Sequence, residues 1–184
     1  MVKIPPRPPL TKGGDLKFFL VLDQEAEMNQ TIRKTPLNSW HKSHGAHMFQ
    51  FGGWEMPLNY GTGIVEEHLA TRKFGGLFDI SHMGRFSVSG RGALPFLQYV
   101  LTNNGAALEP DQGQYTIIAN ETGGAVDDAY LYRPEENEFL LVVNASNTPK
   151  DWAWLNEHRR KFPGVTLEDR TEKIAMFSFQ GRSS

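Results

Sequence analysis

Apolar and polar residues alternate with two different periods along the chain, and these periods predict both helices and strands. Apolar residues spaced three and four positions apart predict helices over 64–74 and 93–101. A short helix is expected to open near Thr35, because proline follows it. Another is expected at Thr148, with the hydroxyl group as its cap and Asp151 as the acid three residues on.

Strands dominate the second half of the predicted fold. A glycine-containing turn over 120–124 separates two alternating segments, which is a strong hairpin signal. The glycine-rich stretch 45–57, in contrast, is interpreted as a loop. The predicted strands are 86–89, 115–119, 129–132, 139–143 and 174–179. Hairpins and helices without strict strand–helix alternation define an α+β fold with mixed or antiparallel sheets and packed helices.

The first 34 residues have a different character from the rest. Four prolines and a Gly-Gly pair oppose regular structure, and most of the early charges are positive. We therefore expect 1–34 to be a leader that is disordered or serves targeting. The folded domain is expected over 35–181, with a tail at 182–184.

Composition and charge exclude several classes of protein. The net charge of −2 lacks the positive bias that binding to nucleic acid requires. No cysteine is present, which excludes thiol nucleophiles, disulfides and thiolate metal sites. The apolar run over 18–22 is far shorter than the roughly 20 residues of a membrane-spanning helix. We expect no membrane segment and no nucleic-acid partner.

Histidines offer two alternative kinds of site. His41, His44 and His47 are spaced by three residues, but no carboxylate lies between them, so packing and surface roles are favoured over a metal site. His82 follows Ser81 closely, yet no glycine-x-serine-x-glycine turn surrounds the serine. A packed loop is favoured over a hydrolytic triad, and no metal is expected.

Two adjacent acids, Asp127 and Asp128, precede a predicted strand and point to opposite faces of it. One carboxylate can therefore be buried while the other stays in solvent. A carboxylate beside Tyr115 and Tyr132 could bind the amino and amide edge of a heterocycle or move a proton. The alternative is that both acids shape the turn and remain solvated.

Many short segments, in unbroken order, resemble the N-terminal half of the glycine cleavage T-proteins, which are aminomethyltransferases. The resemblance covers residues 35–181. The matching segments are 40–41, 45–46, 51–57, 64–68, 76–84, 114–116, 120–121, 123–124, 126–128, 132, 142–145 and 179–181.

This resemblance implies a transferase that takes the aminomethyl group from the lipoyl arm of H-protein. Tetrahydrofolate accepts the one-carbon unit, and ammonia is released. Asp128 matches the family's key catalytic acid. The residues that match folate-contacting positions are Met83, Tyr115, Asp128, Tyr132 and Asn144.

The departures from the family leave alternatives open. Family members are considerably longer, so the folate-binding region is expected to be incomplete here. The chain could then be a non-catalytic folate-binding or interaction protein, or an inactive truncated form. A branch that serves iron–sulfur assembly carries a cysteine motif that is absent, and no dinucleotide motif of a flavin oxidase occurs in 1–34. The expected location is mitochondrial in a eukaryote, which the leader slightly favours, and cytoplasmic in a bacterium.

Overall fold

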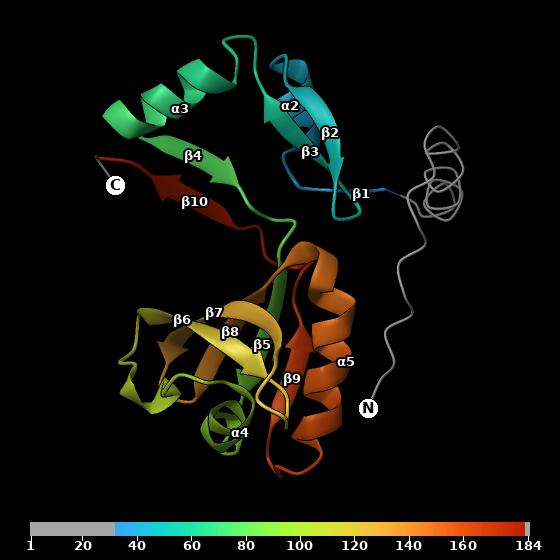
Figure 1. Cartoon of the computed structure of the whole chain (residues 1–184), viewed down its shortest axis with the longest axis vertical. Helices are drawn as coiled ribbons and strands as arrows, with labels where there is room; N and C mark the ends of the chain where they lie inside the picture. Colours follow the sequence, from blue (N-terminus) through green and yellow to red (C-terminus); the bar gives the residue numbers. More distant parts are fainter. Residues whose placement is uncertain (1–31, 183–184) are drawn as a thin grey trace, which may run out of the picture. The chain divides into compact units, whose positions relative to one another are not determined.

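The computed structural model describes residues 32–182, so the leader predicted over 1–34 lies outside the described residues as far as residue 31. The largest sheet of the described part has five antiparallel strands (Figure 1). Its strands, in spatial order, are β6 (Gln112–Ala119), β7 (Ala125–Glu135), β8 (Glu138–Val143), β5 (Gly84–Ser89) and β9 (Thr166–Asp169).

Two helices, α4 (Ala93–Val100) and α5 (Thr148–Arg159), pack apolar side chains against this sheet. Inward side chains of the strands alternate with outward ones, as expected for a sheet with one packed face. The fully buried centre joins residues of both layers: Phe86, Val88, Phe96, Leu97, Leu131, Leu141 and Leu155. The predicted α+β class, the hairpin and these two helices are confirmed.

The remaining elements form two smaller sheets and further helices. One sheet has the order β1 (Arg33–Lys34), β3 (Trp54–Asn59) and β2 (His47–Phe51), and the other pairs β10 (Phe177–Gln180) with β4 (Gly76–Asp79). The helices are α2 (Asn38–Ser43), α3 (Ile64–Lys73) and the short 3-10 turns η1 (Gly105–Ala107) and η2 (Ala145–Asn147).

The interpretation of 45–57 as a loop is wrong, because β2 and β3 form a hairpin there. Phe51 pairs with Trp54, which leaves a two-residue turn of Gly52 and Gly53. Both glycines have positive φ, 55° and 80°, the geometry of the hairpin turns that match strand twist. The glycines therefore join two strands instead of interrupting structure.

Both predicted helix caps are wrong. The helix expected near Thr35 begins at Asn38 instead, and its cap position is Leu37. Thr148 is the first residue of α5 and not its cap, and its hydroxyl group donates to the carbonyl oxygen of Asn144 at 3.0 Å. Asp151 does not close a capping box. It is fully buried against the sheet.

The last predicted strand, 174–179, is present as β10 (Phe177–Gln180). In β10, Phe177 and Phe179 remain 44% and 53% exposed.

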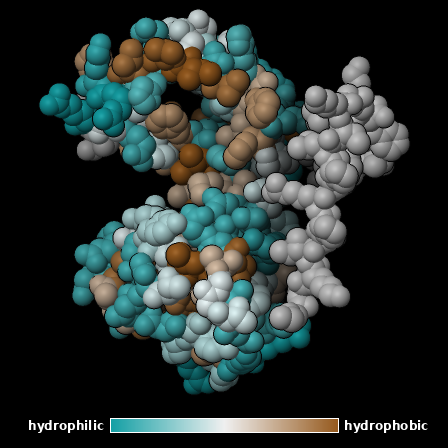
Figure 2. All heavy atoms as spheres, viewed as in Figure 1, coloured by the Kyte–Doolittle hydropathy of each residue, from teal (hydrophilic) through white to brown (hydrophobic). Residues whose placement is uncertain are grey.

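The α3 helix has no buried residue, and it exposes Ile64 and Val65. Figure 2 shows apolar residues gathered over α3 and its surroundings. Among residues 32–182, no helix is long and apolar enough to cross a membrane.

Candidate functional site

The face of the five-stranded sheet opposite α4 and α5 carries the acid and the tyrosines singled out from the sequence. In β7, Asp127 points toward the core, whereas Asp128, Tyr130 and Tyr132 point to the other face. Tyr115 of β6 pairs with Tyr130 and shares this face. Strand alternation thus separates the two adjacent acids as predicted, with Asp127 buried and Asp128 exposed.

The strand register gathers three of the predicted residues at one end of the sheet. Gly84, Val143 and Ala129 are paired across β5, β8 and β7. The residues one step beyond them are Met83, Asn144 and Asp128, which therefore lie at the same end of three neighbouring strands. Met83 is half-buried.

A fully enclosed arginine holds the turn that contains Met83. Arg85 is 1% exposed, and its guanidinium group donates to the carbonyl oxygen of Ser81 at 2.9 Å. The same group donates to the carbonyl oxygens of Met83 and Thr171. Arg85 therefore joins the turn before β5 to the segment after β9.

Asn144 is the centre of the polar contacts at this end of the sheet. Its side-chain amide donates to the Asp128 carboxylate at 2.9 Å and to the two Asp127 carboxylate oxygens at 3.1 and 3.2 Å. Asn147 donates to Asp127 at 2.8 Å. The side-chain amide of Asn144 therefore holds the Asp128 carboxylate, which faces outward, and also contacts the Asp127 carboxylate, which faces the core.

The tyrosines form an aromatic surface along the same face. Tyr115 lies within hydrogen-bonding reach of Asp128, and its pKa is raised by desolvation and then by the charge of Asp128. Tyr132 lies four positions after Asp128 in β7. Its ring packs against that of Tyr130, and the two ring centroids are 4.8 Å apart. Burial, followed by the neighbouring Tyr130, raises the pKa of Tyr132. The structure therefore brings Tyr115 and Asn144 to Asp128, and Tyr130 separates Tyr132 from them.

Gly113 makes room for these rings. It pairs with Tyr132, and a Cβ atom at this position would lie 2.6 Å from Tyr130 Cε1 and 2.8 Å from Tyr132 Cδ1. Both distances are shorter than any ordinary contact, so the rings would have to move. The aromatic surface therefore requires glycine at this position of β6.

We expect Gly113→Ala to displace the tyrosine pair and to destabilise the fold by about 1 kcal/mol through overpacking. The measurement is urea unfolding together with the NMR chemical shifts of the tyrosine rings. Gly61→Ala is the matched control, since nothing lies within 4 Å of the added Cβ. Unchanged ring shifts in the Gly113 variant would contradict the assignment.

Asp127 is buried together with a second carboxyl group, that of Asp151 in the first turn of α5. The two residues are 8% and 0% exposed. Burial alone would raise the pKa of Asp127, but the neighbouring Asp151 and the hydrogen bonds from Asn144 and Asn147 lower it. Burial and the neighbouring Asp127 raise the pKa of Asp151 to about 7.

Three of the histidines singled out from the sequence, His41, His44 and His82, make ring contacts with neighbouring aromatic side chains. His41 is buried, with Nδ1 2.6 Å from the Tyr60 hydroxyl group and Nε2 3.2 Å from the Asp79 carboxylate. It thereby joins α2, the end of β3 and β4. His82 is half-buried near the ring of Phe51, and burial lowers its pKa. Within residues 32–182, no three acids or histidines are grouped to hold a metal ion.

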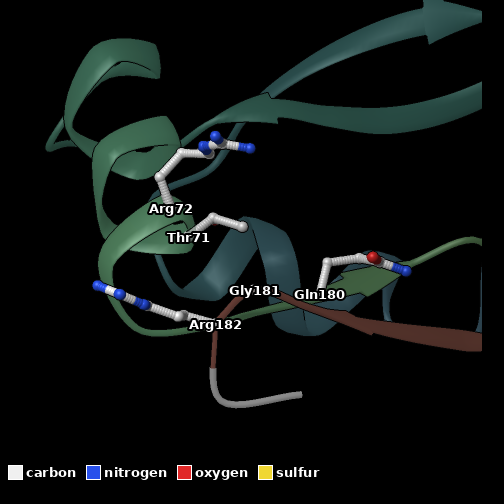
Figure 3. A pocket seen from close by; sticks show the side chains of 5 residues that line it. All are labelled: Thr71, Arg72, Gln180, Gly181 and Arg182. Atoms are coloured by element: carbon white, nitrogen blue, oxygen red, sulfur yellow. The ribbon is translucent and has the colours of Figure 1, made fainter.

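A separate cavity lies at the end of β10 and contains none of the predicted site residues. It is lined by Thr71, Arg72, Gln180, Gly181 and Arg182. Figure 3 shows that the two arginine side chains point away from each other. Because its charged groups do not converge, this cavity is a weaker candidate than the sheet face.

The fold and the sheet face define a class of protein: an α+β domain with a fixed carboxylate beside an aromatic surface. Residues 37–184 match the family model described as the GCVT N-terminal domain. The chain belongs to this family.

Individual relatives agree with the family match. The chain is 49% identical over 150 residues to an aminomethyltransferase of Chlorobaculum parvum and 47% identical to one of Deinococcus deserti. Each match covers 82% of this chain, but only 41% and 42% of the relatives' own lengths. A crystal structure of the glycine cleavage system aminomethyltransferase T from Bartonella henselae matches with a TM-score of 0.74 and 38% identity, covering 83% of this chain and 42% of that chain.

Sequence reasoning missed three residues of this site. Tyr130 lies between the two tyrosines that were singled out, and the period-two alternation from Asp128 onward could have found it. Asp151 was interpreted as a capping acid, and Asn147 was not considered. No local pattern distinguishes a capping aspartate from one that is buried against a strand distant in sequence.

Proposed function

We propose that the chain forms the folate-binding part of an aminomethyltransferase of the glycine cleavage system. In this reaction the aminomethyl group of lipoylated H-protein supplies a one-carbon unit, tetrahydrofolate accepts it, and ammonia is released. The observation that carries the proposal is the Asp128 carboxylate, held by Asn144 and placed beside Tyr115. The names of the relatives support the same reaction.

The sheet face fits a reduced pteridine. Such a ring has an amino and amide edge that a carboxylate can bind, and flat faces that can pack on tyrosine rings. Tyr115, Tyr130 and Tyr132 supply the aromatic surface, and Met83 contributes from the neighbouring turn. We propose that Asp128, Asn144 and these residues hold tetrahydrofolate.

Asp128 has two roles in the proposed reaction. Bound tetrahydrofolate supplies the nucleophilic nitrogen to which the one-carbon unit is transferred. Positive charge develops as the new bond forms, and a carboxylate already fixed by Asn144 stabilises it without reorganisation. The same carboxylate can accept the proton that is released.

The test has two measurements on the 184-residue chain. Calorimetric titration with tetrahydrofolate measures binding, and an assay with aminomethyl-loaded H-protein measures transfer. We expect saturable binding that Asp128→Asn weakens. Transfer together with binding supports the aminomethyltransferase. Binding without transfer supports the alternative, a non-catalytic folate-binding protein. Absence of binding contradicts both.

We propose that the protein lies in the cytoplasm of a bacterium. The named relatives are bacterial proteins, and they give no support to a location in the mitochondrial matrix. We propose H-protein as the partner because the glycine cleavage T-protein family implies it.

A further inference from the structure

Asp151 is a buried carboxyl group that meets no protein donor. Its side chain is fully buried, and neither oxygen has a hydrogen-bond donor among residues 32–182. The group that faces it is another carboxyl, that of Asp127. An ionised carboxylate buried without donors is strongly unfavourable, so this side chain needs another way to satisfy its polarity.

One shared proton satisfies both acids, and the hydrogen bonds show where it belongs. Asp127 accepts bonds from the amide groups of Asn144 and Asn147, which stabilise its ionised form. Asp151 has no such donors. Asp151 is therefore the protonated partner, and its hydroxyl group donates to the Asp127 carboxylate.

We propose that protonated Asp151 is a positioning residue for Asp128: it holds Asp127, and through Asn144 it fixes the outward carboxylate. The chain of contacts is continuous, because one amide nitrogen of Asn144 lies 3.1 Å from Asp127 Oδ1 and 2.9 Å from Asp128 Oδ1. Asp151 itself is buried on the core side and does not touch the exposed face. The inference rests on the proposed function, since it assigns Asp151 a part in the same site.

The arrangement makes the site sensitive to pH. The charged groups that act on Asp151 are Asp127 and Asp128 of β7 and Lys150 on its own helix. Lys150 favours ionisation, but its ammonium group donates to the carbonyl oxygen of Val126 at 2.6 Å. Because the folded pKa of Asp151 is raised to about 7, its proton is lost as pH rises through that value. Two facing carboxylates then repel each other, and the support of Asn144 weakens.

The sign of the effect on stability follows from the same shift. The pKa of Asp151 is higher in the folded state than in the unfolded state, so between the two values the folded state binds more protons. The contribution of Asp151 to the free energy of unfolding is therefore fully present below the unfolded pKa of about 4 and is lost by about pH 7. The difference in unfolding free energy between wild type and Asp151→Asn should therefore change between these values and stay constant above them. This comparison removes the titration of the groups that do not interact with Asp151.

The first experiment compares Asp151→Asn with Asp151→Leu by calorimetric titration with tetrahydrofolate between pH 6 and 8.5. Asparagine imitates the protonated acid, so we expect it to retain binding and to flatten the decline that wild type shows above about pH 7. Leucine lacks the donor, so its variant should bind about tenfold more weakly than the asparagine variant at every pH, the effect of one hydrogen bond to a charged group. Equal behaviour of the two variants overturns the proposal.

The second experiment does not need folate, so it separates this inference from the proposed function. NMR of the wild-type chain follows the carboxyl carbons of Asp151 and Asp128 and the side-chain amide of Asn144 as pH rises. We expect Asp151 to titrate near 7 and the other two to shift at the same pH. If Asp151 is ionised at pH 5, or if Asn144 does not respond, the inference fails whatever the folate result. If these shifts appear without folate binding, only the proposed function fails.

Discussion

Asp128→Asn is expected to lower aminomethyl transfer by at least about 100-fold, because the variant loses the charge that opposes the developing positive charge. Asparagine retains the size of the side chain and can still contact Asn144. It can neither carry the negative charge nor accept a proton. Binding of tetrahydrofolate should weaken about tenfold, as expected for the loss of a charge-assisted hydrogen bond. Turnover and calorimetric titration measure the two effects.

Glu135→Gln is the matched control for this substitution. Glu135 lies on the same strand, is exposed, and undergoes the same change of charge. It should alter neither binding nor transfer. Normal turnover by the Asp128 variant, or an equal loss in both variants, would remove Asp128 from the reaction.

Arg85→Met should destabilise the fold by about 3 kcal/mol or more, since it leaves buried carbonyl groups without donors. The guanidinium group is enclosed and donates to three carbonyl oxygens, those of Ser81, Met83 and Thr171. Methionine replaces part of the volume but none of the hydrogen bonds. Urea unfolding measures the change in free energy.

Arg91→Met tests whether any loss of positive charge has this effect. Arg91 is exposed, so its replacement should stay within about 0.5 kcal/mol of wild type. Because Arg85 also supports the turn that carries Met83, its variant should weaken tetrahydrofolate binding even where the protein remains folded. A stability change below about 1 kcal/mol would show that the carbonyl groups find other donors.

Local signals in the sequence were sufficient for the elements that depend on local chemistry. The turn over 120–124 has the composition of a hairpin turn, and α4 has a clear apolar stripe; both were predicted, and both are present. The β2–β3 hairpin was missed because Gly52 and Gly53 resemble the glycines of an irregular loop. Only the strand pairing shows that they make a two-residue turn.

The candidate site was predictable only in part, because its support is not local. Alternation along β7 predicted that Asp127 and Asp128 face opposite ways. The sequence does not show that α5 returns to the sheet and buries Asp151 against Asp127. Arg85 shows the same difficulty in part: a charged residue in a strand is expected to face solvent, and the carbonyl group of Thr171, which accepts from Arg85, is distant in sequence.

The pairing of β10 with β4 has a consequence for the order of folding. Phe179 pairs with Leu77, about 100 positions earlier, and the whole five-stranded sheet lies between them in the chain. Closing so long a loop is entropically costly until the intervening segment has folded and brought its ends together. A two-stranded ribbon is also marginally stable by itself. We therefore expect this ribbon to assemble late in folding.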